Sequence, residues 1–220
     1  MIDELAARAY GAASEAYERG RPSYPAQALS CLVAEVGLGP ASTVVDLAAG
    51  TGKLTRLLVP LRSTVVAVEP VAAMRAALAE MVPAAEVVAG TAEAMPLAGA
   101  SVDAVVVAQA FHWFRAEAAL AEVARVLRPG GGLGLVWNIR DDSVPWVATL
   151  NDLMRWHEHT VPPHPDQMDW PAIVASHGGF TSLQRRCFAN DHELDAATLV
   201  DRVVSTSYIA DWPAGDQDAL

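Results

Sequence analysis

Apolar positions along the chain follow two spacings, which are short unbroken runs and helical repeats. The unbroken runs are rich in valine and lie at about 43–47, 64–68, 86–89, 102–108 and 132–138. Between them, apolar residues recur every three or four positions, at about 52–60, 71–81 and 113–127. Runs without polar alternation predict strands buried on both faces, and the helical spacing predicts amphipathic helices. Strands that alternate with helices predict an α/β fold with a parallel sheet.

Weaker patterns flank this central region on both sides. Residues 3–19 and 25–37 have helical spacing before the first strand. After residue 140 the patterns predict, in order, a helix over 144–159, a proline-rich loop over 161–171, a short helix near 170–177, a strand over 180–190 and a helix over 195–210. No strand pattern follows, so we expect a sheet that lacks a final C-terminal strand.

The segment at 44–52 reads VVDLAAGTG and is the most informative stretch of the chain. A buried strand runs into a glycine turn, and a helix opens directly after Gly52. Glycines in such a turn let a ligand approach the backbone closely. Glu69 ends the next strand, 69 − 50 = 19 positions after Gly50. This is near the roughly 20-residue offset at which an acidic residue binds ribose hydroxyls, so we predict a cofactor that contains adenosine.

The spacing of the glycines separates the candidate cofactors. A nicotinamide or flavin fingerprint needs a third glycine where this chain has Thr55, which argues against a dehydrogenase. A Walker A loop needs a glycine in place of Leu47 and a serine or threonine in place of Leu54. Asp46, at the strand end, would repel a pyrophosphate group but suits an ammonium or sulfonium group.

Six motifs occur in order along most of the chain. They are 17–25 (YERGRPSYP), 46–52 (DLAAGTG), 68–74 (VEPVAAM), 90–97 (GTAEAMPL), 101–114 (SVD to QAFHWF) and 126–131 (VLRPGG). Together they resemble the class I S-adenosylmethionine-dependent methyltransferases, and most closely the small-molecule branch that includes trans-aconitate methyltransferases. Family members often carry Gly-Cys where Ala48-Ala49 stand here, and alanine is small enough for us to expect that cofactor binding persists.

The resemblance implies a Rossmann-like, doubly wound, mostly parallel sheet with helices on both faces and an N-terminal helical lid. It implies one methyltransferase domain over 1–220, with a helical cap at 1–40, a cofactor-binding core at 41–140, and a substrate-side insertion and C-terminal part at 141–220. The implied methyl donor is S-adenosyl-L-methionine, and the implied product is S-adenosyl-L-homocysteine.

The expected cofactor contacts lie in all but the last of these motifs. They are Tyr17, Arg21, Asp46, Ala48, Gly50, Gly52, Glu69, Pro70, Met74, Thr91, Ala92, Glu93, Gln109 and Ala110. We expect Glu69 to bind the ribose hydroxyls, and Asp46 to support either the turn or the cofactor's amino group. By resemblance, Met74 packs on the adenine, although a methionine on a helix is as often a core residue. Also by resemblance, Gln109 contacts the methionine end of the cofactor.

The acceptor side carries fewer signals. The expected substrate pocket comprises Tyr24, Trp113, Trp137 and Arg140. By resemblance, Tyr17, Arg21 and Tyr24 form a lid that faces the site, whereas a plain helix–helix connection would leave Arg21 exposed. Arg140 meets a substrate carboxylate or pairs with a neighbouring aspartate. His112 is the candidate catalytic residue, as a base or as a group that orients a substrate oxygen, and a structural histidine is the alternative.

The composition excludes several other functions. The net charge is −11 and no basic run occurs, which argues against nucleic acid as a substrate. No apolar stretch is long enough to span a bilayer, and the acidic N-terminus lacks a secretory pattern, so we expect a cytoplasmic protein without a membrane partner. His157 and His159 are two positions apart and would not share a helical face, so we expect no metal site.

These observations favour methyl transfer to a small molecule by in-line displacement, with carboxylic acids among the candidate acceptors. Such a reaction depends mainly on holding the acceptor against the methyl group and on excluding water. One alternative is a catalytically silent S-adenosylmethionine-binding protein with a regulatory or structural role. We expect a monomer or a homodimer, since a missing final strand would leave a sheet edge for pairing.

Overall fold

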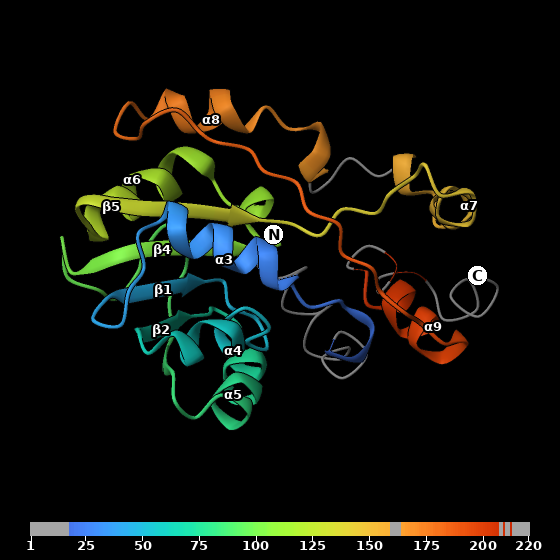
Figure 1. Ribbon diagram of the computed structural model, residues 1–220, viewed down its shortest axis with the longest axis horizontal. Helices are drawn as coiled ribbons and strands as arrows, with labels where there is room; N and C mark the ends of the chain where they lie inside the picture. The colour runs from blue at the N-terminus through green and yellow to red at the C-terminus, as the bar shows by residue number, and fades with distance from the viewer. Residues whose placement is uncertain (1–17, 159–163, 207–208, 210–211, 213–220) are drawn as a thin grey trace. The chain divides into compact units, whose positions relative to one another are not determined.

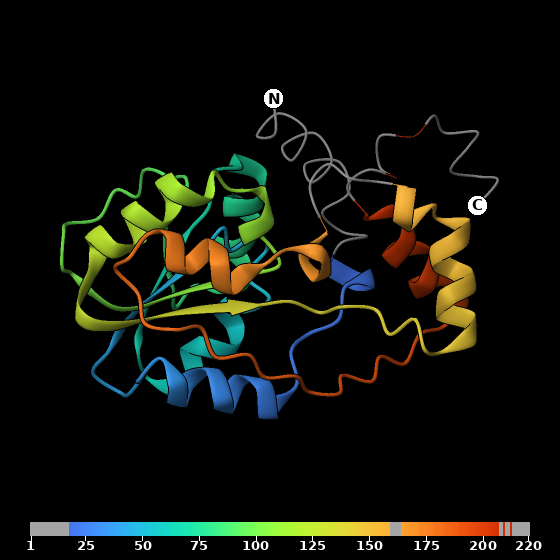
Figure 2. The ribbon, with the colours of Figure 1, turned by 90° about the horizontal axis from the view of Figure 1, so that it is seen from above.

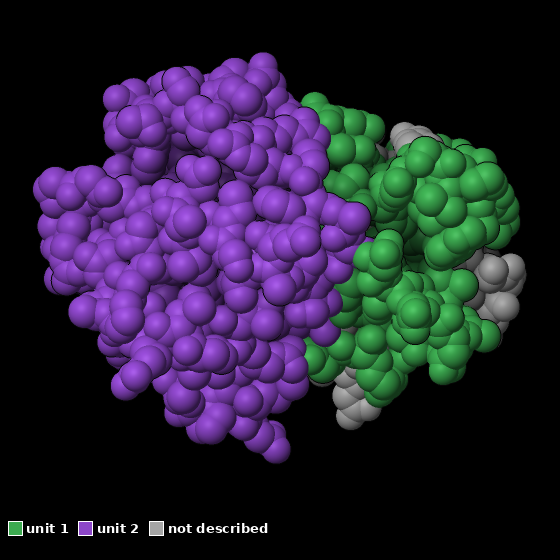
Figure 3. All heavy atoms as spheres, in the orientation of Figure 1, with its two compact units in different colours: residues 1–22, 138–167, 191–220 green, residues 23–137, 168–190 purple. Residues whose placement is uncertain are grey.

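The computed structural model describes residues 18–158, 164–206, 209 and 212 (Figure 1). The chain divides into two compact units, which Figure 3 shows in different colours. Unit 1 comprises Met1–Pro22, Asn138–Gln167 and Asp191–Leu220, and unit 2 comprises Ser23–Trp137 and Met168–Asn190.

Unit 2 is built on a five-stranded sheet in the order β3-β2-β1-β4-β5, in which every pairing is parallel. The strands are β1 Thr43–Leu47, β2 Thr64–Val68, β3 Glu86–Val88, β4 Val102–Ala108 and β5 Leu127–Val136. β1 pairs with β2 along one edge and with β4 along the other. The strand order therefore reverses between β1 and β4, and α/β proteins bind ligands beyond the carboxyl ends of the strands at such a point.

Helices cover both faces of this sheet. They are α3 Ala26–Glu35, α4 Thr55–Leu58 with the 3-10 helix η1 Val59–Leu61, α5 Ala72–Met81, the 3-10 helix η2 Phe111–Trp113, α6 Ala116–Val126 and α8 Trp170–Ser176. Figure 2 shows α6 and α8 on one face and α3 on the other. The predicted α/β fold, with a parallel sheet between helical layers, is confirmed.

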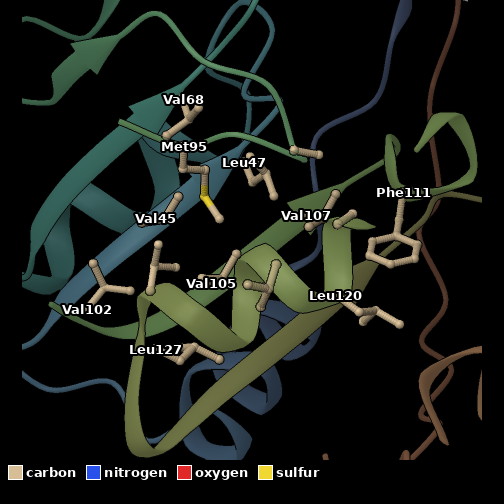
Figure 4. Packing of buried hydrophobic residues seen from close by; sticks show 14 of the residues in the cluster. Val45, Leu47, Val68, Met95, Val102, Val105, Val107, Phe111, Leu120 and Leu127 are labelled. Atoms are coloured by element: carbon tan, nitrogen blue, oxygen red, sulfur yellow. The ribbon is translucent and has the colours of Figure 1, made fainter. Parts of the chain in front are cut away.

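The alternation of side chains along the strands explains the two layers. Val45 of β1 belongs to the larger apolar core with Leu120 of α6 (Figure 4). Its neighbour Val44 packs in a second core with Leu32 of α3. Successive residues of a strand point to opposite faces, so an unbroken valine run supplies both cores at once. The helical stripe on α6 is also confirmed, since Leu120, Val123 and Val126 are buried.

Unit 1 has its own small apolar cluster. Its elements are α7 Pro145–Leu153, the 3-10 helices η3 Trp156–Glu158 and η4 Pro165–Gln167, and α9 Ala196–Val204. Met154, Val203 and Ile209 form the buried centre of the cluster. Among the described residues of both units, no helix is long and apolar enough to cross a membrane.

Two expected features of the chain need correction or lie outside the described residues. The strand predicted over 180–190 is wrong, because 181–190 has no regular structure. Nearly all of its residues are exposed, so the segment has no buried face that would favour pairing. The helix predicted over 3–19 falls almost wholly outside the described residues, and no strand follows β5 within the described part of the chain.

Candidate functional site

The turn after β1 has an unusual backbone conformation. Ala48, Gly50 and Gly52 all have positive φ angles, of 56°, 59° and 86°. A Cβ atom on Gly50 would meet no atom within 4 Å, so open space lies beside the backbone there. A Cβ on Gly52 would lie 3.1 Å from Leu78 Cγ of α5, so the glycine also permits close packing. The turn therefore exposes its backbone at the carboxyl end of the central strand, as the motif predicts.

Glu69 follows β2 and fastens this turn to the neighbouring strand. Its Oε2 accepts a hydrogen bond from the Gly50 N–H at 2.9 Å, and its Oε1 accepts one from the Val71 N–H at 2.8 Å. The side chain is 5% exposed. Burial raises the pKa of Glu69, and the two backbone N–H groups partly oppose this shift. The glycine turn and the expected ribose-binding carboxylate are thus brought together.

Asp46 is buried at the end of β1. Its Oδ2 accepts a hydrogen bond from the Thr55 hydroxyl at 2.6 Å, whereas its Oδ1 is buried without a hydrogen-bond partner among the described residues. Burial is the main cause that raises the pKa of Asp46 to about 7, and the charge of Glu69 adds to it. Two carboxyl groups therefore share one buried edge of the sheet.

This pair of carboxyl groups fits a cationic ligand. A buried carboxylate oxygen without a partner is unfavourable, and a nearby positive charge or N–H donor removes that penalty. An amino-acid cofactor with an ammonium group supplies such a donor, whereas a pyrophosphate would add to the repulsion. The open Asp46 Oδ1 and the exposed turn backbone match the methionine portion of S-adenosylmethionine better than a dinucleotide.

The residues around this edge have mixed surroundings. Met74 of α5 is buried, and Ala92 lies in the larger apolar core. Thr91 closes a tight turn by exchanging backbone hydrogen bonds with Ala94, at 3.3 and 3.2 Å. Glu93 Oε1 accepts a hydrogen bond from the Arg115 N–H at the start of α6, at 3.0 Å, so its carboxylate already has a structural partner.

The predicted residues Pro70, Gln109 and Ala110 follow the carboxyl ends of β2 and β4. Pro70 is exposed, and its carbonyl and that of Glu69 accept hydrogen bonds from the Arg75 guanidinium. Gln109 directly follows β4 and has a positive φ of 61°, and its N–H donates to the Val136 carbonyl of β5 at 2.8 Å. Ala110 follows at the start of η2 and packs against the larger core.

His112 lies in an aromatic group beside these strands. The Trp137 indole N–H donates to His112 Nδ1 at 3.2 Å. Trp137 stacks on Trp170 of α8, with ring centroids 4.5 Å apart, and the His112 and Trp113 rings are 5.8 Å apart. An indole nitrogen can only donate, so Nδ1 of His112 is the acceptor and Nε2 carries the proton of the neutral ring.

Apart from Tyr17, the remaining predicted residues have other described contacts. Tyr24 packs against the second core, with α3. Arg21 and Arg140 belong to unit 1, where Arg21 donates to the Ser205 carbonyl at 2.9 Å and the Arg140 guanidinium lies 4.1 Å from the centre of the Trp156 ring. Tyr17 lies outside the described residues.

Two residues of this region carry roles that the motif analysis did not assign. Thr55, which counted only as a missing glycine, is the hydrogen-bond partner of Asp46. Trp170 follows a proline-rich stretch and stacks on Trp137. The sequence signal for Thr55 is a hydroxyl nine positions after the strand-end aspartate. No local pattern signals the stacking of Trp170. Among the described residues, no group of three metal-ligating side chains gathers.

Comparison with known proteins defines the class. A family model described as "Methyltransferase domain" matches residues 45–135, which run from β1 to β5. The solved structure of the YcgJ protein from Bacillus subtilis has the same fold, with a TM-score of 0.53, 22% identity, and 69% of this chain and 67% of that chain covered. The residues matched by the family model include Asp46, the glycine turn and Glu69.

Longer relatives establish the family for nearly the whole chain. An uncharacterised methyltransferase of Mycobacterium tuberculosis is 44% identical over 205 residues, which are 93% of this chain and 79% of that protein. An uncharacterised methyltransferase of Schizosaccharomyces pombe is 43% identical over 205 residues, 93% of this chain and 80% of that protein. The chain therefore belongs to the class I S-adenosylmethionine-dependent methyltransferases. It is an enzyme whose cofactor is S-adenosylmethionine.

Proposed function

We propose that this enzyme transfers the methyl group of S-adenosylmethionine to a small-molecule acceptor by in-line displacement. The observation that carries the proposal is the joint placement of the glycine turn, Glu69 and Asp46 at the switch point of the sheet, where Asp46 Oδ1 has no hydrogen-bond partner among the described residues. When bound, the cofactor supplies a methyl group on a positively charged sulfur, which leaves as a neutral thioether.

In this proposal the carboxyl ends of β1, β2 and β4 hold the cofactor. Glu69 keeps lone pairs for the ribose hydroxyls while its two oxygens hold the turn and the Val71 N–H. Asp46 Oδ1 accepts from the amino group of the methionine portion, and Gln109 lies at the end of the next strand. By resemblance alone, Ala92 and Glu93 remain expected to lie beside the adenine, and Met74 remains expected to pack on its face.

His112 has a narrower role than a general base. Its Nδ1 lone pair is engaged by the Trp137 indole, and its neutral Nε2 carries a proton. In the proposed role, the ring donates a hydrogen bond through Nε2 to an acceptor oxygen. This geometry supports a histidine that orients a substrate oxygen over one that acts as a base. A purely structural histidine stays the competing interpretation.

A small acceptor fits the charge of the molecule. Nucleic acids require clustered Lys and Arg, and this chain has 15 such residues against 26 acidic ones. The similarity to trans-aconitate methyltransferases suggests an organic acid as acceptor. That finer assignment rests on the motifs, because the named relatives at 44% and 43% identity are themselves uncharacterised.

Calorimetric titration with S-adenosylhomocysteine tests the cofactor site. We expect Glu69→Gln to weaken binding by roughly tenfold to a hundredfold, because hydrogen bonds to a charged group contribute about 1.5–3 kcal/mol. Glu86→Gln is the matched control, since Glu86 is an exposed residue at the amino end of β3. His112→Ala should leave this affinity nearly unchanged.

The same titration can overturn the assignment. Near wild-type affinity in folded Glu69→Gln would mean that the ribose is held elsewhere. An equal loss in Glu86→Gln would show that the effect is a general consequence of lost charge. Thermal unfolding of each variant separates a lost contact from a loosened turn, since Glu69 also holds the Gly50 N–H.

A further inference from the structure

Three arginines from distant parts of the sequence come together in unit 1. The chain at Gly20 packs directly on α9, because a Cβ there would lie 2.4 Å from the backbone nitrogen of Arg202. The next residue, Arg21, donates from Nη2 to the Ser205 carbonyl at 2.9 Å and from Nε to the Ser205 hydroxyl at 3.3 Å. Arg21 is therefore fixed beside the last turn of the helix that carries Arg202.

Arg140 is held beside the same segment of chain. Asn138 Nδ2 donates to the Pro22 carbonyl at 3.5 Å, which brings the chain leading to Arg140 next to the chain that follows Arg21. The Arg140 guanidinium stacks on the Trp156 ring at 4.1 Å. Trp156 in turn lies 4.1 Å from the ring of His164, which is buried. Stacking on the aromatic face holds the Arg140 guanidinium in a fixed plane.

Of the three arginines, Arg202 has a buried guanidinium whose positive charge no described carboxylate balances. Its Nη1 is buried and has no hydrogen-bond partner among the described residues. Burial is the main cause that lowers the pKa of Arg202 to about 10, and the charges of Arg21 and Arg140 contribute to the same shift. The adjacent carboxylate, Asp201, is paired with Arg19 at 2.7 Å. Within the described part of the chain, no carboxylate offsets the buried positive charge of Arg202.

Such an arrangement is unfavourable for a protein without a ligand. A buried charge normally persists only when it is paired, and like charges placed beside it increase the cost. Guanidinium groups bind carboxylates through paired N–H donors, and a carboxylate at this position would offset the mutual repulsion. The apolar cluster of Met154, Val203 and Ile209 lies in the same unit, and Val203 adjoins Arg202 on α9.

We propose that Arg21, Arg140 and Arg202, the arginine cluster, bind the carboxylate group of a small organic acid within unit 1. The apolar and aromatic neighbours favour an acid with a carbon skeleton over an inorganic anion. Because the whole chain has a net charge of −11, only a local concentration of arginines can attract an anion. The proposal concerns unit 1 alone and does not depend on methyl transfer.

Thermal unfolding and calorimetry with succinate test the proposal on the full chain. Succinamide is the uncharged probe, inorganic phosphate is the inorganic anion, and sodium chloride keeps the ionic strength constant. We expect succinate to raise the unfolding temperature, succinamide to leave it unchanged, and phosphate to have a smaller effect than succinate. Arg202→Met should weaken succinate binding by at least about tenfold.

The variant also separates a binding role from a structural one. If the role of Arg202 is to bind an anion, removing its buried charge should not destabilise the ligand-free protein. Without succinate, Arg202→Met should then unfold at the same temperature as the wild type or at a higher one. Arg155→Gln, at an exposed position of the same unit, should bind succinate like the wild type. If Arg202→Met does not fold, Arg202→Lys replaces it and should bind succinate more weakly than the wild type, since lysine lacks the planar fork.

Three results would overturn the proposal. The first is a wild-type chain that binds neither succinate nor phosphate, and the second is binding that Arg202→Met or Arg202→Lys leaves unchanged. The third is equal or tighter binding of phosphate, which would assign the cluster to inorganic anions. A titration with S-adenosylhomocysteine on the same samples shows whether the cofactor site is intact, so failure here is distinguishable from failure of the methyltransferase assignment.

Discussion

At the scale of single residues, two carboxyl groups hold the glycine turn in place. Glu69 accepts a hydrogen bond from the Gly50 N–H, and Asp46 accepts one from the Thr55 hydroxyl. Glu69 could be found by counting from Gly50, because the length of a strand–helix–strand unit is nearly constant. Its hydrogen bond to the Gly50 N–H could not, since that contact depends on the shape of the turn. For the same reason, the glycine spacing identifies Thr55 only as a residue that replaces a third glycine, and it does not predict the hydrogen bond from Thr55 to Asp46.

The titration of Asp46 predicts that cofactor binding depends on pH. With a pKa of about 7 in the free protein, Asp46 is largely protonated below pH 7 and ionised above it. An ammonium group on the ligand favours the ionised form, so binding releases a proton. We expect the affinity for S-adenosylhomocysteine to rise by up to about tenfold per pH unit below pH 7 and to level off above it.

Calorimetry in buffers of different ionisation enthalpy counts the released proton. Asp46→Asn should bind more weakly above pH 7 and lose the pH dependence, while keeping a hydrogen-bond partner for Thr55.

The stability of the free protein depends on pH in the opposite direction to the cofactor affinity. A raised carboxyl pKa contributes stability fully below the ordinary value of 3.8, and this contribution is lost as the pH rises through about 7. An unchanged pH dependence in Asp46→Asn would remove Asp46 from the cofactor site.

At the scale of elements, unbroken valine runs and helical stripes predicted most of unit 2. The bounds of β1, β2 and β4 agree with the predicted runs, because a strand buried on both faces leaves a clear sequence pattern. The segment 180–190 misled for a related reason. Phe180 and Leu183 pack against the core, but their neighbours are exposed, so two apolar contacts were mistaken for a strand.

The turn between β1 and α4 offers a matched pair of substitutions. Ala48 has a φ of 56°, a conformation that costs a non-glycine residue about 1–2 kcal/mol, and family members often carry glycine there. We expect Ala48→Gly to raise the free energy of unfolding by up to about 1 kcal/mol, after the backbone entropy of glycine is subtracted. Ala49→Gly should lower it by about 0.5–1 kcal/mol, since Ala49 does not have a positive φ and packs on the apolar cluster of α5.

Chemical denaturation of the two variants measures these changes. Opposite signs at adjacent alanines would confirm that the backbone conformation of the turn, and not its apolar content, decides the preference. Destabilisation in both variants would show that Ala48 is not strained. S-adenosylhomocysteine binding to Ala48→Gly should remain, because only the backbone of this residue is expected to face the ligand.

At the scale of the whole molecule, the sequence predicted the sheet and its helical layers but not how distant segments combine. Arg21, Arg140 and Arg202 are spread over most of the chain, and only folding shows that they repel one another. The stacking of Trp170 on Trp137 is hidden for the same reason. Contacts of this kind have no local periodicity, so pattern analysis finds the elements and misses the clusters that they build.

Transfer of a labelled methyl group tests the central claim most directly. The purified chain is incubated with S-adenosylmethionine labelled on the methyl group and with a pool of small organic acids, then separated by size. We predict label in the small-molecule fraction, and its loss in Glu69→Gln but not in Glu86→Gln. Label found only in protein or nucleic acid added to the mixture would contradict a small acceptor. No transfer to any fraction by a chain that binds S-adenosylhomocysteine would contradict the proposed transfer to small organic acids.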